Sequence, residues 1–175
     1  AVLVTHEHPD HLDAPSIRAA LAEQPGLELW ANPSVTAQFA DFGDRVHEVG
    51  HGDTFTAAGF DVHVYGREHA TIMPGIPVIA NTGFAVDAAV FHPGDSFTVP
   101  EDRVPVLLLP VSAPWLKFAE VAAYATEVSP ERGVAIHDAI MSAQGLGLIG
   151  NLLSVLSGDQ AGRYARLDPG TSLDL

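Results

Sequence analysis

The chain has 175 residues, of which 47% are hydrophobic, and this length suits one domain with one core better than two domains. It contains no cysteine, so disulfides, thiolate zinc sites and cysteine nucleophiles are excluded, and any metal must be held by His, Asp or Glu. The formal net charge is −14, from 22 acidic against 8 basic residues, and Lys117 is the single lysine. Such a charge disfavours nucleic-acid binding, which depends on clustered Lys and Arg.

Hydropathy gives an expectation about location and partners. No apolar stretch reaches the length of a membrane-spanning helix, and no basic segment followed by an apolar one opens the chain as a signal peptide would. We therefore expect a cytoplasmic protein. Its expected partner is a small-molecule substrate rather than a nucleic acid or a membrane, and the composition is compatible with a homo-oligomer.

The first quarter of the chain alternates apolar runs with helical patterns. Residues 1–5 predict a buried strand, and residues 13–24 predict a helix that Asp13 caps. A second strand is predicted over residues 27–31 and a second helix over residues 33–42. This order is typical of a β-α-β-α segment.

The middle of the chain is rich in β-strand signals. Residues 45–49 predict one strand, and residues 53–66 predict a hairpin that turns at Ala58–Gly59. Residues 76–95 predict a second hairpin that turns near Asn81–Gly83. The middle therefore adds antiparallel strands to the fold.

The last third returns to alternating strands and helices. Residues 104–111 form a continuous apolar run, as expected of a strand covered on both faces. Helices are predicted over residues 117–128 and about 141–156, with a buried strand over residues 133–138 between them. Together these elements predict an α/β sandwich with sheets inside and helices outside.

The stretch VTHEHPDH, residues 4–11, brings three histidines and an aspartate directly after the first predicted strand. Side chains alternate along extended backbone, so His6, His8 and Asp10 can share a face. The turn into the next helix lets His11 swing round beside Asp10, so that one loop can serve two adjacent cations. A polar turn with no metal is the alternative, but four such groups at this spacing favour metal binding.

The pattern of His6, His8, Asp10 and His11 resembles the HxHxDH signature of the metallo-β-lactamase superfamily, and GREHA, FHPGDS and VAIHD follow in the order of its later motifs. The resemblance covers nearly the whole chain and implies an αββα sandwich with mixed sheets inside and helices outside. It also implies one cation held by His6, His8 and His69, a second held by Asp10, His11 and His137, and Asp95 as the bridge between them.

The segments EHATIMPGIPVIANTGFAVD, FHPGDS and LPVSAPW resemble more narrowly a branch of metal-dependent hydrolases that includes a lactonase of ascorbate phosphate and, more distantly, phospholipid phosphodiesterases. The resemblance implies a dinuclear hydrolase acting on an ester, lactone or phosphoester bond. A hydroxide between the cations would be the nucleophile, because metal binding lowers the pKa of water from 15.7 to about 7, and Asp10 and Asp95 would position it. Zinc is the expected metal, with manganese or iron as alternatives.

Three alternatives to this function stay open. One is a phosphodiesterase of the same superfamily, and another is a metal-binding scaffold without turnover, against which the complete ligand set argues. The third is a di-iron redox protein of the same superfamily. Such proteins commonly carry a glutamate where this chain has His8.

Four further residues are candidates for supporting the site. His92 lies three positions before Asp95, and Asp138 could orient a ligating imidazole, since such histidines usually pass their other N–H group to an oxygen. Trp115 and Lys117 follow a predicted strand and could line a substrate pocket. For Asp138 an ordinary loop acid is the alternative, and for Lys117 a surface lysine at the start of a helix.

Other features favour structural explanations. GLGLIG, residues 145–150, matches the GxGxxG pattern but is not set in a βαβ unit, so a dinucleotide site is not expected. Ser96 lacks the GxSxG context of a serine nucleophile. His47, His51 and His63 have no ligand spacing, and we expect them on the surface or in packing contacts.

The beginning of the chain departs from the family pattern. Family members usually have an N-terminal β-hairpin region, with a glycine-histidine-alanine stretch and a strand ending in Asp-Pro, whereas this chain opens inside the strand that delivers His6. A buried strand needs hydrogen-bonding neighbours or a covered edge. We therefore expect residues 1–175 to be one hydrolase domain of a longer polypeptide, with some tens of preceding residues that complete the first sheet. The alternative is a compact variant whose edge is covered by dimerisation or by residues 164–175.

Overall fold

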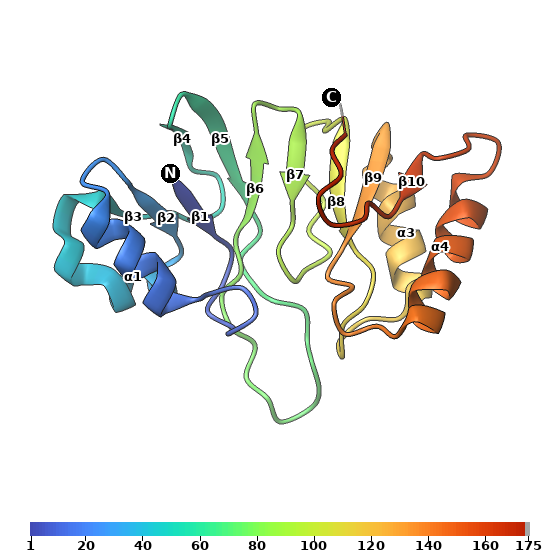
Figure 1. Cartoon of the computed structure of the whole chain (residues 1–175), viewed down its shortest axis with the longest axis horizontal. Helices are drawn as coiled ribbons and strands as arrows, with labels where there is room; N and C mark the ends of the chain where they lie inside the picture. The colour runs from blue at the N-terminus through green and yellow to red at the C-terminus, as the bar shows by residue number, and fades with distance from the viewer. Residues whose placement is uncertain (174–175) are drawn as a thin grey trace.

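The computed structural model describes residues 1–173, which form two sheets with helices on their outer sides (Figure 1). The smaller sheet has three parallel strands in the order β1-β2-β3. The larger sheet has seven strands in the order β10-β9-β8-β7-β6-β5-β4. This arrangement confirms the predicted αββα sandwich.

The smaller sheet and its helices come from the first 48 residues. Its strands are β1 (Val2–Val4), β2 (Leu29–Ala31) and β3 (Val46–Glu48), and its helices are α1 (Ala14–Glu23), α2 (Pro33–Thr36) and the 3₁₀ segment η1 (Ala37–Arg45). As predicted, Asp13 caps α1, because its carboxylate accepts hydrogen bonds from the N–H and hydroxyl of Ser16 at 3.1 and 2.7 Å. Leu21, Leu29 and Phe39 form the buried contacts between these helices and the sheet.

The helix predicted over residues 33–42 is only partly correct. The α-helix ends at Thr36, and the backbone continues as 3₁₀ turns interrupted at Phe39 and Gly43. Gly43 has φ of +58°, a left-handed conformation that glycine adopts at little cost and that ends any regular helix. The apolar spacing predicted the buried face but not this change of helix type.

The antiparallel half of the larger sheet contains β4 (Thr54–Ala57), β5 (Phe60–Tyr65), β6 (Gly83–Val86) and β7 (Val90–His92). The turn predicted at Ala58–Gly59 is confirmed, and both residues have positive φ, as a tight hairpin turn requires. The turn predicted near Asn81–Gly83 is wrong, because the second hairpin turns at Asp87–Ala89. Asp87 and Ala88 adopt the positive φ there, and the Asp87 carboxylate accepts the N–H of Asp61 at 2.8 Å.

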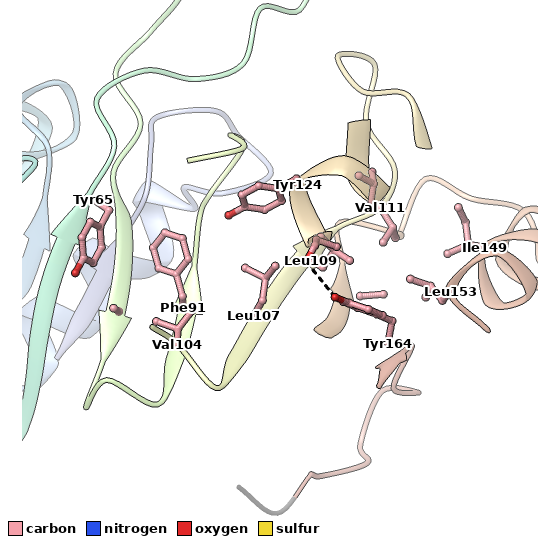
Figure 2. Close-up of a cluster of buried hydrophobic side chains, with 14 residues drawn as sticks. Tyr65, Phe91, Val104, Leu107, Leu109, Val111, Tyr124, Ile149, Leu153 and Tyr164 are labelled. Carbon is pink, nitrogen blue, oxygen red and sulfur yellow. Dashed lines mark hydrogen bonds between the residues drawn. The ribbon is translucent and has the colours of Figure 1, made fainter. Parts of the chain in front are cut away.

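The parallel half of the larger sheet has helical crossovers. It consists of β8 (Val106–Pro110), α3 (Phe118–Val128), β9 (Arg132–Ile136), α4 (Ala143–Ser157) and β10 (Tyr164–Ala165). Figure 2 shows the core between this sheet and the two helices, where Tyr164 reaches α3 and donates a hydrogen bond to the carbonyl of Ala125 at 3.1 Å. The GLGLIG segment lies inside α4, so it forms no phosphate-binding loop. The short strand β10 was not predicted.

The two sheets pack face to face. Leu3 and Trp30 of the smaller sheet pack against Val62, Val64 and Phe84 of the larger one. Within residues 1–173, β1 pairs with β2 alone, while β10 pairs with β9 in the other sheet; residues 174–175 of the proposed C-terminal cover lie outside the described residues. No helix in this range is long and apolar enough to cross a membrane.

Candidate metal centre

The ends of four strands bring the predicted ligands together at one edge of the sandwich. The loop after β1 carries His6 to His11, and the long loop between β5 and β6, which projects at the bottom of Figure 1, carries His69. Asp95 follows β7 and His137 follows β9. Because β5, β7 and β9 run in the same direction, their carboxyl ends meet at one edge.

All seven predicted ligands lie in this cluster. Three sets of ligand atoms lie within 4.8 Å of one another: His6, His8 and His69; His6, His11 and Asp95; and Asp10, His11 and His137. The first and third sets have the composition that the resemblance implied for the two cation positions. Asp95 lies between them, close to residues of both.

The orientation of three imidazoles fits metal binding. The Nδ1 atom of His6 contacts the hydroxyl of Thr5 at 3.0 Å, that of His69 contacts the carbonyl of Ala70 at 2.6 Å, and that of His137 contacts the carbonyl of Ser112. A carbonyl can only accept, so Nδ1 of His69 and of His137 carries a proton, and Nε2 is the nitrogen that faces the cluster and could bind a metal.

The Nε2 atoms of the same three histidines, His6, His69 and His137, are buried and have no hydrogen-bond partner among the described residues. An unsatisfied buried polar atom costs about 1–3 kcal/mol, so three such atoms directed into one space need an explanation. A cation bound at these nitrogens supplies the missing partner. The donor set of imidazoles and carboxylates also suits a divalent cation.

Asp95 is the centre of the cluster and is only 4% exposed. Its Oδ1 lies 3.2 Å from Nε2 of His11, and its Oδ2 lies 3.4 Å from Nε2 of His69 and 3.2 Å from Nε2 of His137. Burial alone would raise the pKa of the Asp95 carboxyl, but the three neighbouring imidazoles outweigh burial and lower that pKa below its ordinary value. The carboxylate is therefore ionised and lies between the two sets of candidate ligands.

The pKa values of the histidines follow from the same arrangement. Burial, with a further contribution from His11, lowers the pKa of His6 to about 3, so its imidazole is neutral, the form that binds metal. The neighbouring Asp95 carboxylate raises the pKa of His137 to about 9. Asp95 therefore favours a proton on this imidazole, and a cation bound at Nε2 would take the place of that proton.

The backbone at His137 is strained. Its φ is +61°, which is uncommon for a residue other than glycine and costs free energy that the surrounding structure must offset. The carbonyl of Ile136 accepts the N–H of Val111 at 3.1 Å, which holds this point of the chain against the loop after β8. Strain of this kind concentrates at functional sites, and here it turns the imidazole toward Asp95.

The four supporting candidates have different surroundings. His92 accepts the N–H of Gly94 at 3.0 Å, and burial, followed by the charge of His11, lowers its pKa to about 4. Trp115 donates from its indole to Oδ2 of Asp95 at 3.0 Å. Asp138 pairs with Arg166, so the carbonyl of Ser112 rather than Asp138 orients His137.

Lys117 lies at the N-terminus of α3. Its backbone N–H donates to the carboxylate of Glu120 at 2.9 Å, and its side chain is exposed. This matches the helix-start alternative for Lys117. The remaining histidines contact other groups: His47 stacks on Trp30, and His63 approaches the carboxylate of Asp102 to 3.2 Å.

A cavity of about 260 Å³ opens beside the cluster. Its lining residues are Asp10, His11, His92, Ile136, His137, Ala139 and Ile140. A larger cavity of about 330 Å³ also touches His11 and His92, but the cavity of 260 Å³ is lined by three proposed ligands, and we therefore take it as the candidate substrate cavity.

Sequence reasoning missed several residues that hold the cluster together. Thr5, Asn81 and Thr82 are buried polar residues whose hydrogen bonds connect the ligand-bearing segments. Polar residues inside otherwise apolar runs could have indicated such buried contacts. At Asn81, however, the same polar residues also predict a turn.

Comparisons with known proteins show what the chain is similar to. A family model described as the beta-lactamase superfamily domain matches residues 1–137. Protein Rv0786c from Mycobacterium tuberculosis is 39% identical over 153 residues, which cover 85% of this chain and 71% of that protein.

Two solved structures share the fold. Igni18, a metallo hydrolase from the archaeon Ignicoccus hospitalis, superposes with a TM-score of 0.70 at 20% identity, covering 98% of this chain and 77% of that one. The metallo-beta-lactamase fold protein YhfI from Bacillus subtilis superposes with a TM-score of 0.66 at 15% identity, covering 97% of this chain and 75% of that one.

Proposed function

Because the chain belongs to the beta-lactamase superfamily and has the metallo-β-lactamase fold, we propose that it is a metal-dependent hydrolase with two divalent cations. The observation that carries the proposal is the convergence on Asp95 of imidazoles whose buried Nε2 atoms have no hydrogen-bond partner in the described part of the chain. Membership of the superfamily and the fold shared with a metallo hydrolase support it.

Each cation would have its own ligands and share Asp95. The first would bind His6, His8 and His69, and the second Asp10, His11 and His137, in agreement with the clusters of ligand atoms. We propose zinc as the metal, since imidazole and carboxylate ligands suit it, with manganese or iron as alternatives. Two such cations would lower the pKa of a water molecule toward 7 and polarise the bond to be cleaved.

The side chains of this chain would divide the remaining work. Asp95 is buried and fixed, so it holds the ligand nitrogens in place. Asp10 has a side chain that is 64% exposed, and its Oδ2 lies 3.5 Å from Nε2 of His137, so at the cavity wall it could bind the second cation and position the attacking water. His92 forms part of the same wall.

The cavity favours an uncharged ester or lactone over a phosphoester. Its lining, within the described residues, combines acidic, imidazole and apolar groups. It includes no Lys or Arg that could bind the charged oxygens of a phosphoester. Ile136 and Ile140 would contact the apolar part of a substrate. The overall charge of −14 adds repulsion against anionic substrates.

Metal reconstitution with a substrate panel tests the proposal. The protein is freed of metal, reconstituted separately with Zn²⁺, Mn²⁺ and Fe²⁺, and analysed for bound metal and for turnover of a lactone, a carboxylic ester and a phosphodiester. We expect about two cations per chain and metal-dependent turnover of the lactone or ester. Uptake without turnover would favour the scaffold alternative, turnover of the phosphodiester alone would favour the phosphodiesterase, and failure to bind any of the metals would contradict the site.

A matched pair of histidine variants localises the metal. His8→Ala removes a proposed ligand, whereas His63→Ala removes a partly exposed histidine that faces Asp102. The first variant should bind fewer cations per chain and the second should bind as many as the wild type. Equal stoichiometry in the two variants would place the metal elsewhere.

A further inference from the structure

Asn81 lies in the long loop between β5 and β6, next to the proposed metal centre but outside its ligand set. Its side chain is fully buried, at 0% exposure. Since a buried amide must be hydrogen-bonded to be tolerated, its partners reveal what this residue does.

The amide of Asn81 holds the turn that carries Asp95. Its Oδ1 accepts the backbone N–H of Asp95 at 3.0 Å, and its Nδ2 donates to the carbonyl of Pro93 at 2.8 Å. The carbonyl of Asp95 accepts the N–H of Ala70 at 2.8 Å, so both backbone groups of Asp95 are fixed. Because the backbone of Asp95 is held in this way, the position of its Cα and the direction of its side chain are fixed.

Asn81 lies so close to this turn that position 94 must be a glycine. A Cβ added to Gly94 would lie 2.2 Å from Oδ1 of Asn81 and 2.9 Å from Cβ of Thr5. Gly94 also has φ of +67°. The backbone of the turn is therefore packed directly against the amide, with no room for a side chain between them.

The backbone around Asn81 connects the turn to two other ligand-bearing segments. The N–H of Asn81 donates to the carbonyl of Arg67 at 3.2 Å, two residues before His69. The backbone N–H and the hydroxyl of Thr82 both donate to the carbonyl of Thr5, at 2.9 and 3.1 Å, directly before His6. Asn81 and Thr82 thus touch three segments, which together carry six of the seven proposed ligands.

We infer that Asn81 is a positioning residue for Asp95 and that its amide determines how strongly the site binds its cations. This inference rests on the proposed function, since it assumes a metal shared through Asp95. The requirement is for one side chain that accepts from the Asp95 N–H and donates to the Pro93 carbonyl at once, which an amide does and a carboxylate or an alkyl group does not. Loss of either bond frees the turn and with it the carboxylate.

The test measures metal binding rather than turnover. The affinity for Zn²⁺ is determined by competition with a chelating dye, and the absorption spectrum of bound Co²⁺ reports the ligand geometry. Asn81→Leu keeps a similar volume without hydrogen-bonding groups. It should bind Zn²⁺ about 10 to 100-fold more weakly, the loss typical of residues that orient metal ligands, and its Co²⁺ spectrum should differ from that of the wild type.

Two control variants separate positioning from general damage. Ser96 lies beside Asp95 in the same turn. Ser96→Ala removes the hydroxyl that donates to Pro93 at 3.1 Å and that accepts weakly from Nδ2 of Asn81 at 3.4 Å, but it leaves the two shorter bonds of Asn81 in place. Leu153→Ala lowers stability by leaving a cavity in the core between the larger sheet, α3 and α4, which includes no proposed ligand. Both should keep the wild-type Co²⁺ spectrum and an affinity close to that of the wild type.

The outcomes are distinguishable. If Asn81→Leu binds Zn²⁺ like the two controls, the inference is wrong, whereas failure of the wild type to bind metal would refute the proposed function instead. If Asn81→Leu does not fold, Asn81→Asp takes its place: it keeps an acceptor for the Asp95 N–H and removes the donor to the Pro93 carbonyl. Wild-type affinity and spectrum in Asn81→Asp would overturn the inference, and weakened binding would support it.

Discussion

Trp115 donates a hydrogen bond from its indole nitrogen to Oδ2 of Asp95 over 3.0 Å, which joins the loop after β8 to the carboxylate at the centre of the site. Its ring also meets that of His69 edge to face, with centroids 5.9 Å apart. The other tryptophan, Trp30, stacks on Phe55 and His47 between the sheets. One of the two indoles in the chain therefore contacts the proposed metal centre directly.

This contact predicts a fluorescence signal on metal binding. A cation at Asp95 withdraws charge from the oxygen that Trp115 contacts, so the emission of that indole should change. In a Trp30→Phe background, titration with Zn²⁺ should change the emission until about two equivalents are bound. The same titration of Trp115→Phe, in which Trp30 is retained, serves as the control and should show no change. An equal response from that protein would show that the signal does not come from the Asp95 contact.

Asp95→Ala should abolish hydrolysis while leaving the fold intact. The carboxylate lies close to three imidazoles, so its loss should disturb both cation positions together. Turnover and far-ultraviolet circular dichroism are measured on the same preparation. His92→Ala provides the comparison, because a residue that supports the site typically costs roughly 10 to 100-fold when it is removed. A larger loss in His92→Ala than in Asp95→Ala would contradict the assignment of the bridge.

The proposed metal loop could be predicted from sequence because its signal is local, whereas His69, Asp95 and His137 were predicted from the family resemblance of GREHA, FHPGDS and VAIHD. Six consecutive positions after an apolar run contain His6, His8, Asp10 and His11, and this spacing alone indicates a metal loop. The strands that deliver the other ligands are short apolar runs of the expected type. They meet at one edge because β5 and β7 are both antiparallel to β6, while β7, β8 and β9 are parallel; the sequence indicated this meeting only through the family resemblance.

The supporting contacts could not be predicted because they join residues far apart in the chain. Asn81, which precedes Asp95 in the chain, and Trp115, which follows it, both form hydrogen bonds with Asp95. A local reading of Asn81 and Gly83 indicates a turn, and the tertiary hydrogen bonds override it. The orientation of His137 likewise depends on the backbone carbonyl of Ser112. Every residue type has such a carbonyl, so the sequence does not indicate this contact.

Metal binding should stabilise the folded protein measurably. The unfolded chain does not hold the ligands together, so a cation binds the folded state preferentially. At a free Zn²⁺ concentration about 100 times its Kd, the free energy of unfolding should rise by about 2.7 kcal/mol. Thermal unfolding with Zn²⁺ and with a chelator measures the difference, and Asp95→Ala should show a smaller one. A thermal midpoint independent of both additions would argue against a preformed site.

Two glycines with positive φ allow the packing around Asp95 to be tested separately from backbone strain. Gly94 has φ of +67° and Gly59 has φ of +89°, so alanine at either position incurs the cost of a left-handed backbone, about 1–2 kcal/mol. A Cβ at Gly59 meets no atom within 4 Å, whereas one at Gly94 would collide with Asn81 and Thr5. Gly94→Ala should therefore unfold at a lower denaturant concentration than Gly59→Ala, and it alone should lose metal affinity, because the collision displaces the Asp95 turn. Urea unfolding of the metal-free proteins and Zn²⁺ titration of each check the two effects. Equal stability and equal affinity in the two variants would mean that the turn can move without cost, and the tight placement of Asp95 would then have no part in metal binding.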